Sequence, residues 1–323
     1  MMIDTFDINA AGFDGPVIVT GAGGCIGSWA LKILRAHGIP VTALDLKKDV
    51  RRPKLLMSED QVESIPWIEG DISVPDTILN AVESSRATAI IHLAALQVPF
   101  CKNDPILGAQ VNVVGTVNVF EAARKFGIKR LCYASSIAAH GVFDENTVPT
   151  LYGAYKFCNE ETAKVYARDW GVASTGMRPG VVYGVGRDQG MTSKTTIAIL
   201  AAALREKYTI PFRGDVSWLH AGEVASAFIR SVSAPRSEAK VFDINGSTLS
   251  VEDSISIIKK ITGYEGISPS GTPLPFPMAL SDTPLIDYLG SYGSVQIEKG
   301  IKHTYDSFLS LIGTGQLDAS SLG

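Results

Sequence analysis

Residues 17–28 read Val17-Ile-Val-Thr-Gly-Ala-Gly-Gly-Cys-Ile-Gly-Ser28, a short β-branched run that passes directly into glycines spaced three apart. Gly21, Gly24 and Gly27 permit a tight turn from a strand into a helix, and they let backbone N–H groups approach a phosphate at the positive end of that helix. A turn with a purely structural role would use the same glycines. Because strand, turn and helix follow one another in the order that a dinucleotide site requires, the segment predicts dinucleotide binding.

Around this stretch, short apolar runs alternate with longer segments of helical periodicity. Strands are expected at residues 17–20, 41–44, 89–93, 130–133, 174–177 and 240–244, and helices at 26–36 and 111–126. This alternation is typical of a parallel sheet with helices on both faces, and strands that are apolar throughout indicate that both faces are covered. The predicted fold class is therefore α/β, a Rossmann-type doubly wound parallel sheet.

The composition changes after Arg178-Pro-Gly180. Residues 181–216 and 247–323 contain more Gly, Pro and Ser, with helices expected at about 194–206 and 251–262. Five prolines between Pro269 and Pro284 predict an irregular covering loop. We predict a dinucleotide-binding domain over residues 1–180 and a smaller, mixed, mainly substrate-binding region over residues 181–323, with residues of about 217–246 returning to the first domain.

The composition also excludes several classes of protein. Of the 323 residues, 46% are apolar and 19% charged, which is typical of a globular chain and excludes a disordered one. The net charge of −4, without a long Lys/Arg run, argues against nucleic-acid binding. No apolar run reaches the roughly 18 residues that a membrane-spanning helix needs, and the N-terminus lacks a secretory signal.

The four cysteines, Cys25, Cys101, Cys132 and Cys158, are scattered along the chain. They form no C-x-x-C pair and have no histidine at metal-ligand spacing. We therefore expect reduced thiols, no metal site and a cytoplasmic location. The expected partner is a small-molecule substrate rather than a nucleic acid or a membrane.

An acidic residue, Asp45, ends the second expected strand. A carboxylate there accepts hydrogen bonds from the adenosine ribose and repels a 2′-phosphate, which predicts NAD rather than NADP. Lys47 and Lys48 would partly attract such a phosphate, and a loop or capping role for Asp45 is the alternative. Asp71 and Ile72, after the expected third strand, suit contacts with adenine.

Tyr152 and Lys156, in Leu151-Tyr-Gly-Ala-Tyr-Lys156, are one helical turn apart on the same side of a helix. A tyrosine titrates near pH 10, so it is a poor base at neutral pH unless an adjacent ammonium and a nicotinamide cation favour the phenolate. Ser135 and Ser136 follow a strand at the sheet edge where ligands bind, so either hydroxyl suits a substrate carbonyl. A surface Tyr–Lys pair and a turn serine are the alternatives.

Together these segments resemble the extended short-chain dehydrogenase/reductase superfamily, of the NAD-dependent epimerase/dehydratase type. The resemblance runs from about Val17 to Gly184 and more loosely to Gly246. It rests on the glycine loop, Asp45, Asp71-Ile72, His92-Leu-Ala-Ala95, Asn112-Val-Val-Gly-Thr116, Ser135-Ser136, Tyr152-Gly-Ala-Tyr-Lys156 and Arg178-Pro-Gly-Val-Val-Tyr-Gly184.

This resemblance implies roles for the matching residues. Ser136 would be the catalytic serine and Tyr152 the acid/base, with Ser135 and Tyr155 as their rivals. Lys156 would bind the nicotinamide ribose and tune the tyrosine. Asn112 would help to fix the hydrogen bonds of the active site. The implied NAD-binding residues are Gly21, Gly24, Cys25, Ile26, Gly27, Asp45, Asp71, Ile72, Leu93, Ala94, Ala95, Tyr152, Lys156 and Pro179.

The chain departs from that family where an arginine would grip the diphosphate of a nucleotide sugar. The segment Val216-Ser-Trp-Leu-His-Ala-Gly-Glu223 contains no Arg-Asp pair, and Arg213 is the nearest substitute. The stretch between Ser136 and Tyr152 is also short, and both features favour a smaller substrate. Polar residues that suit hydroxyls or a carboxylate follow Tyr183-Gly184, namely Arg187, Asp188, Gln189, Thr192 and Ser193.

Three functions are compatible with these residues. The leading hypothesis is a dehydrogenase that transfers a hydride between NAD and a secondary alcohol or ketone of a small polyhydroxylated substrate, a sugar or sugar acid. An NAD-retaining sugar or nucleotide-sugar epimerase or dehydratase is the second. A non-catalytic cofactor-sensing protein is the third, and a sensor does not need the set of Ser136, Tyr152 and Lys156.

The resemblance also implies an assembly. The helices at about 106–126 and 153–168 correspond to those that pair across a two-fold axis in many members of the family, so a homodimer with an isologous interface is expected. The apolar residues expected on the outer faces of these helices are Val119, Phe120, Phe157 and Val165.

Overall fold

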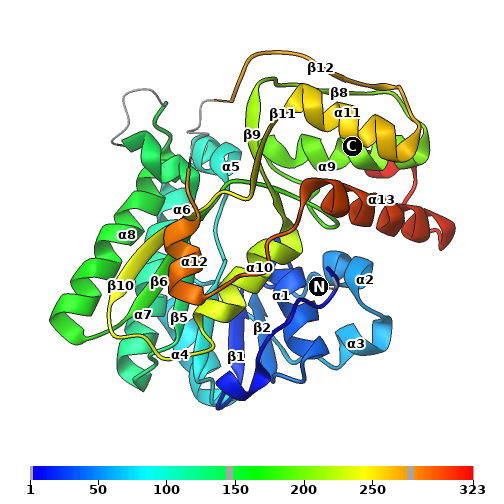
Figure 1. Cartoon of the computed structure of the whole chain (residues 1–323). Helices are drawn as coiled ribbons and strands as arrows, with labels where there is room; N and C mark the ends of the chain where they lie inside the picture. Colours follow the sequence, from blue (N-terminus) through cyan, green and yellow to red (C-terminus); the bar gives the residue numbers. More distant parts are fainter. Residues whose placement is uncertain (1–2, 143–147, 275–279, 323) are drawn as a thin grey trace.

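A computed structural model describes residues 3–142, 148–274 and 280–322 (Figure 1). Its centre is a parallel sheet of seven strands in the order β10-β6-β5-β4-β1-β2-β3. The strands are β1 (Val17–Thr20), β2 (Val41–Asp45), β3 (Trp67–Glu69), β4 (Ala89–His92), β5 (Leu131–Ala134), β6 (Ser174–Pro179) and β10 (Ala239–Ile244). The predicted Rossmann-type fold class is confirmed.

Helices cover both faces of this sheet because its strands are apolar on both sides. On β1, Val17 and Val19 pack into the core under α1 (Cys25–Ala36) and α10 (Ala221–Ser231). Between them, Ile18 faces the opposite core, under α4 (Pro75–Ser85), α7 (Gly115–Phe126) and α8 (Leu151–Trp170). In register, β1 pairs with β2 on one side and with β4 on the other. The strand order therefore reverses at β1, where a doubly wound sheet opens a ligand crevice.

A smaller region lies to the upper right in Figure 1. It contains a mixed sheet of β11 (Ser247–Ser250), β9 (Asp215–His220) and β7 (Val181–Tyr183), and a parallel pair of β12 (Ile267–Pro269) and β8 (Tyr208–Ile210). Its helices include α9 (Lys194–Leu204), α11 (Val251–Thr262) and α13 (Ile297–Gly313). Between β9 and β11 the chain returns to the large sheet as α10 and β10. The division into two domains at residue 180 stays a prediction.

Shorter elements connect these layers. They are α2 (Arg51–Leu56), α3 (Glu59–Glu63), α5 (Val98–Asn103), α6 (Pro105–Ala109), α12 (Thr283–Leu289), a π-helical turn (Gln110–Val114) and 3-10 turns at Ala10–Gly12, Ile137–Val142, Met191–Ser193 and Ala319–Leu322. The expected proline-rich loop is bounded by β12 and α12, and its residues 275–279 lie outside the described residues. The expected helix over 111–126 is a π-helical turn that continues into α7.

The helical stretch Pro105–Phe126 is apolar enough, with a mean hydropathy of 1.2 over its most apolar window, to cross a membrane by length and composition. The sequence-based expectation that no segment is long and apolar enough to span a membrane is therefore wrong by the criterion of length and composition. Half of the window is buried inside the protein, however, as in a core helix. Val119 and Phe120 are fully buried under the sheet, so their expected place on an outer face is also wrong.

Candidate active site

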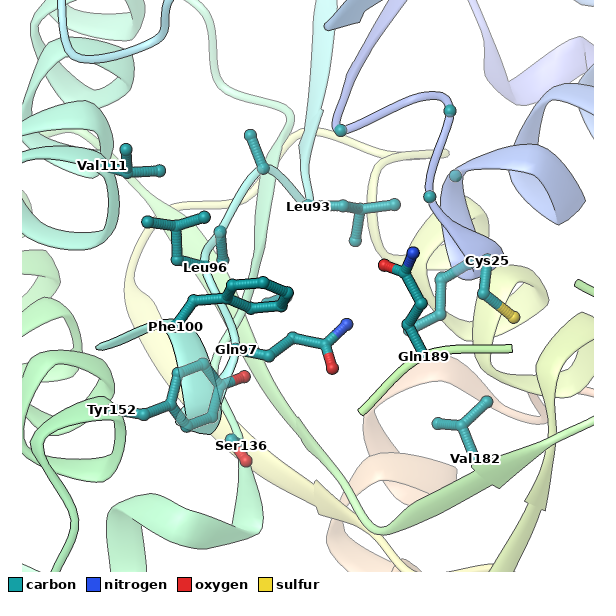
Figure 2. Close-up of a pocket in the computed structure, with 18 of the residues that line it drawn as sticks. Cys25, Leu93, Leu96, Gln97, Phe100, Val111, Ser136, Tyr152, Val182 and Gln189 are labelled. Carbon is teal, nitrogen blue, oxygen red and sulfur yellow. The ribbon is translucent and has the colours of Figure 1, made fainter. Parts of the chain in front are cut away.

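A cleft of about 650 Å³ opens at the carboxyl ends of the central strands. Its walls are the glycine loop after β1, the segment after β4, the start of α8 and the segment that follows β6 and β7 (Figure 2). Every predicted NAD-binding residue lines this cleft, as do Ser136, Tyr152 and Lys156. Asn112 does not line it.

The glycine loop is a cradle that side chains would fill. Gly21 has a φ of +68°, and a Cβ on it would lie 2.7 Å from the backbone nitrogen of Ala94. A Cβ on Gly27 would lie 2.3 Å from the carbonyl oxygen of Gly21. Helix α1 starts directly after Gly24 and no side chain caps it, so its first N–H groups are open to an anion. These residues therefore fit the pyrophosphate of a dinucleotide.

Asp45 lies at the end of β2 beside this loop. Its carboxylate accepts the N–H groups of Gly23 at 2.9 Å and of Leu46 at 2.8 Å. Burial raises the pKa of Asp45, and these two hydrogen bonds lower it. Each oxygen keeps a lone pair for a further donor, such as a ribose hydroxyl.

Arg52, which the sequence did not single out, crosses the glycine loop from α2. Its guanidinium donates to the carbonyl oxygen of Gly23 at 3.1 Å and pairs with Asp188 at 2.7 Å. The ion pair ties α2 to the segment after Tyr183, and no local pattern reveals a contact between residues 136 positions apart.

The start of α8 brings Ser136, Tyr152 and Lys156 together. Gly153 packs so closely on the turn after Ser136 that a Cβ there would lie 2.2 Å from the carbonyl oxygen of Ala138. Tyr152 and Ser136 both line the cleft, and the Ser136 side chain is close enough to lower the pKa of the Tyr152 hydroxyl (Figure 2). The Lys156 ammonium donates to the carbonyl oxygen of Ala134 at 2.6 Å and lies 5.6 Å from the centre of the Tyr152 ring.

The two rival side chains have other partners. The Ser135 hydroxyl donates to the buried carboxylate of Glu160, which Arg178 also holds, at 2.7 Å from its Nε. The Tyr155 hydroxyl donates to the carbonyl oxygen of Pro105 at 2.9 Å, outside the cleft. The geometry therefore favours Ser136 over Ser135 and Tyr152 over Tyr155.

Burial has the largest effect on the pKa values of Tyr152 and Lys156. It raises the pKa of Tyr152, while the hydrogen bond to Ser136 and the charge of Arg187 lower it. Burial also lowers the pKa of Lys156 to about 8, against the charges of Cys101 and Glu160. The sequence pattern assigned the stabilising charge to Lys156, and the structure adds Arg187, whose charge lowers the pKa of Tyr152.

Asn112 holds the segment after β4 from behind. Its side-chain oxygen accepts the N–H of Leu96 at 2.7 Å, and its amide donates to the carbonyl oxygen of Leu96 at 2.9 Å. Thr20 fixes the start of the same segment, because its hydroxyl accepts the N–H groups of Leu93 and Ala94, both at 3.2 Å. Asn112 thus positions a wall of the cleft without touching the space inside it.

The substrate end of the cleft differs in two ways from the sequence-based expectation. Arg213 is no substitute for the missing diphosphate-binding arginine, because it lies outside the cleft and pairs with Glu252 at 3.0 Å. Gln97 and Phe100 were not singled out, but Figure 2 shows their side chains in the middle of the cleft. Their place directly after the segment Leu93–Ala95 was the available signal.

Comparison with known proteins shows to which family the chain belongs. Residues 17–245 match the NAD dependent epimerase/dehydratase family. The chain belongs to this family. Over 249 residues it is 27% identical to an uncharacterised epimerase/dehydratase of Staphylococcus aureus (strain USA300), and the match covers 72% of this chain and 74% of that relative.

Solved structures share the fold of this chain. A UDP-glucose 4-epimerase of Thermus thermophilus, solved in complex with NAD, is 24% identical with a TM-score of 0.74 and covers 91% of this chain and 98% of its own. An L-threonine dehydrogenase of Clostridium difficile is 22% identical with a TM-score of 0.80 and covers 93% of this chain and 98% of its own. As a member of the NAD dependent epimerase/dehydratase family with an intact glycine cradle, the protein is an enzyme and its cofactor is NAD.

Proposed function

We propose that this family member is a dehydrogenase that transfers a hydride between NAD and a secondary alcohol or ketone of a small polyhydroxylated substrate, a sugar or sugar acid. The observation that carries this proposal is the meeting of Ser136, Tyr152 and Lys156 in the same cleft as the glycine cradle. When bound, NAD supplies the hydride acceptor for the oxidation of the alcohol.

Three side chains have separate roles in the proposed reaction. Tyr152 takes the proton from the substrate hydroxyl, and the nearness of Ser136 supports a role for both groups at the same substrate oxygen. The Ser136 hydroxyl donates a hydrogen bond to that oxygen as it becomes a carbonyl. Lys156, held by Ala134 one helical turn from Tyr152, binds a ribose hydroxyl and keeps positive charge beside the tyrosine.

The residues on β9 that stand where the family has its diphosphate-binding Arg-Asp pair favour a small substrate over a nucleotide sugar. Along β9, Val216 and Trp218 are fully buried, and the Ser217 hydroxyl donates to the carbonyl oxygen of Asn245 at 2.5 Å. These side chains present no positive charge to a diphosphate, and Arg213 is engaged elsewhere.

An NAD-retaining epimerase or dehydratase is the second candidate. It is favoured by the ion pair between Arg52 and Asp188, which spans the glycine loop and would slow cofactor exchange. Such an enzyme oxidises its substrate only transiently, so it returns the hydride before the product leaves.

Net NADH formation separates the two candidates. Purified enzyme is mixed with excess NAD and a panel of sugars and sugar acids, and NADH absorbance is followed. The proposal predicts that NADH accumulates to many times the enzyme concentration with at least one of these substrates. Conversion of a sugar to its epimer or to a dehydrated product, without NADH accumulation, would reject the dehydrogenase and support the second candidate.

A further inference from the structure

Arg187 carries a guanidinium group in the cleft whose hydrogen bonds are mostly unused. One nitrogen, Nη2, donates to the Thr192 hydroxyl at 3.1 Å. Its Nε is buried and has no hydrogen-bond partner among the described residues. The neighbouring carboxylate, Asp188, is paired with Arg52 instead. Leaving a buried charged donor unpaired costs free energy, which an anionic ligand would recover.

The guanidinium lies on the substrate side of the cleft. A Cβ on Gly190 would come within 3.3 Å of Arg187 Nη2 and within 2.2 Å of Gln97 Oε1, so both side chains border the same residue. Figure 2 shows the Gln97 amide between Ser136 and Tyr152 on one side and Cys25 and Gln189 on the other. The charge of Arg187 also lowers the pKa of Tyr152, as expected for two side chains that line the same cleft.

We propose that Arg187 binds a carboxylate of the substrate, so that the enzyme acts on hydroxy acids rather than on neutral sugars. This inference rests on the proposed function and narrows its substrate class. The planar guanidinium fork matches the two oxygens of a carboxylate, which a lysine does not. The Thr192 hydroxyl fixes one nitrogen of the fork, and the Gln97 amide, whose Oε1 borders Gly190, lies where it can hydrogen-bond to a neighbouring substrate hydroxyl.

The pyrophosphate of NAD is the other anion within reach, because the charge of Arg187 also acts on Cys25 at the start of α1. The uncapped N-terminus of α1 faces that anion, and Arg52 already places a cation at the carbonyl oxygen of Gly23. Arg187 Nη2 instead contacts Thr192. With the pyrophosphate already served by these groups, we assign the substrate carboxylate to Arg187, and the NADH affinity of the Arg187 variants tests the pyrophosphate as the alternative.

Binding to the enzyme–NADH complex tests this assignment without requiring turnover. The probes are D-threonate and D-gluconate, each paired with its neutral primary amide, and the dissociation constant is measured by the change in NADH fluorescence. The variants are Arg187→Gln and Arg187→Lys. Arg213→Gln is the matched control, because Arg213 is exposed and paired with Glu252 outside the cleft.

In the wild type and in Arg213→Gln, at least one carboxylate is expected to bind more tightly than its amide. Arg187→Gln should raise the dissociation constant of that carboxylate by roughly tenfold to a hundredfold, as expected for losing one bidentate charged pair. The dissociation constant of the amide should stay unchanged. Arg187→Lys should give an intermediate loss. All three variants should bind NADH with wild-type affinity.

Any one of four results would overturn the assignment. One is equal binding of acid and amide, or no binding of either acid, in the wild type. Another is an unchanged acid-to-amide ratio in Arg187→Gln. The third is a loss of NADH affinity in Arg187→Gln at an unchanged ratio, which would place Arg187 on the pyrophosphate. Fourth, if the enzyme oxidises neutral sugars and the Arg187 variants do so equally well, only the carboxylate site is rejected. If an acid binds in a way that depends on Arg187 but no NADH forms, only the proposed dehydrogenase activity is rejected.

Discussion

Asp45 accepts two backbone N–H groups with its two oxygens, from Gly23 and Leu46. Both contacts hold the carboxylate at the edge of the cleft, where the glycine loop meets β2. A negative charge there repels the 2′-phosphate of NADP and accepts hydrogen bonds from the ribose of NAD. Lys47 also lines the cleft, so the preference depends on the carboxylate outweighing this nearby cation.

The Asp45 charge sets a testable cofactor preference. We expect the wild type to bind NAD much more tightly than NADP. Asp45→Asn keeps an oxygen for the Gly23 N–H and removes the charge. The ratio of the two affinities should therefore fall by roughly tenfold or more, as expected for losing a charged hydrogen bond together with a repulsion. Titration of both cofactors by intrinsic fluorescence measures the ratio, and equal affinities in the wild type would contradict the role of Asp45.

Neighbouring residues show what a motif alone leaves open. The serine pair and the Tyr-x-x-x-Lys spacing identified segments that line the cleft, while the preference for Ser136 over Ser135 came from the family resemblance. The choice between Ser135 and Ser136 depends on Glu160, which binds the first hydroxyl from another turn of α8. The sequence named Arg187 as one of five polar residues that suit hydroxyls or a carboxylate, but its buried Nε, unpaired among the described residues, is a property of the folded cleft.

At the scale of elements, the turn from β1 into α1 depends on the absence of side chains. Gly27→Ala would place a Cβ 2.3 Å from the carbonyl oxygen of Gly21 and 2.8 Å from Ala22 Cα. Because these are backbone atoms, the cradle itself must move. We expect NAD affinity to fall by roughly tenfold or more, equivalent to about 1.4 kcal/mol. Gly313→Ala is the control, since nothing lies within 4 Å of its added methyl group. Unchanged NAD affinity in Gly27→Ala would contradict the fit.

A buried acid at the start of α10 makes stability depend on pH. Glu223 accepts the backbone N–H of His220, and burial raises the pKa of this carboxyl to about 8. Since this folded-state pKa lies above the ordinary value of 4.5, the group favours folding most below pH 4.5, and that contribution is lost as the pH rises to about 8.

Glu223→Gln removes this proton linkage while keeping an acceptor for the His220 N–H. Urea denaturation should therefore show a flatter pH dependence for the variant, which should gain stability relative to the wild type as the pH rises from 4.5 to 8. The gain should amount to a few kcal/mol at most, at about 1.4 kcal/mol for each unit of pKa shift. Parallel pH profiles of the two proteins would show that Glu223 does not titrate in this way.

The periodicity of the sequence predicted long elements better than irregular ones. Both faces of the sheet need apolar strands, so the six expected strands lie within one or two residues of β1, β2, β4, β5, β6 and β10. The π-helical turn at Gln110–Val114 was not foreseen, because an apolar helical pattern continues through it. This turn places Asn112 at Leu96, which is a tertiary contact and leaves no mark on local periodicity.

At the scale of the whole molecule, an apolar groove lies on the outer side of α8. It is lined by Val142, Ala154, Phe157, Cys158, Glu161, Thr162, Val165, Tyr166 and Trp170. Val165 is 38% exposed and Trp170 51% exposed. The homodimer through this helix stays a prediction, as does a cytoplasmic location.

Light scattering checks the predicted assembly. At micromolar concentration we expect the mass of two chains, and Val165→Glu should shift the protein toward one chain because a charge would be buried in the interface. Leu309→Glu is the control, since Leu309 is 42% exposed on α13. A wild-type protein with the mass of one chain would refute the dimer.

The cleft forms only when the whole chain is folded, because its walls come from distant parts of the sequence. The large sheet supplies the glycine cradle and Ser136, α8 supplies Tyr152, and the segment after β7 supplies Arg187. The Arg52–Asp188 pair joins two of these walls. Sequence motifs identified each wall separately, whereas their contact across the cleft followed from the fold.

We propose above all that Tyr152 transfers the substrate proton in an NAD-dependent oxidation. The most direct test compares the turnover and NAD affinity of the wild type with those of Tyr152→Phe, which loses one oxygen and keeps the packing of the ring. We predict NAD affinity close to that of the wild type and turnover lower by about 10²–10⁴-fold, as expected for losing general acid–base catalysis. Near-normal turnover in Tyr152→Phe would contradict the claim and show that the proton leaves by another group.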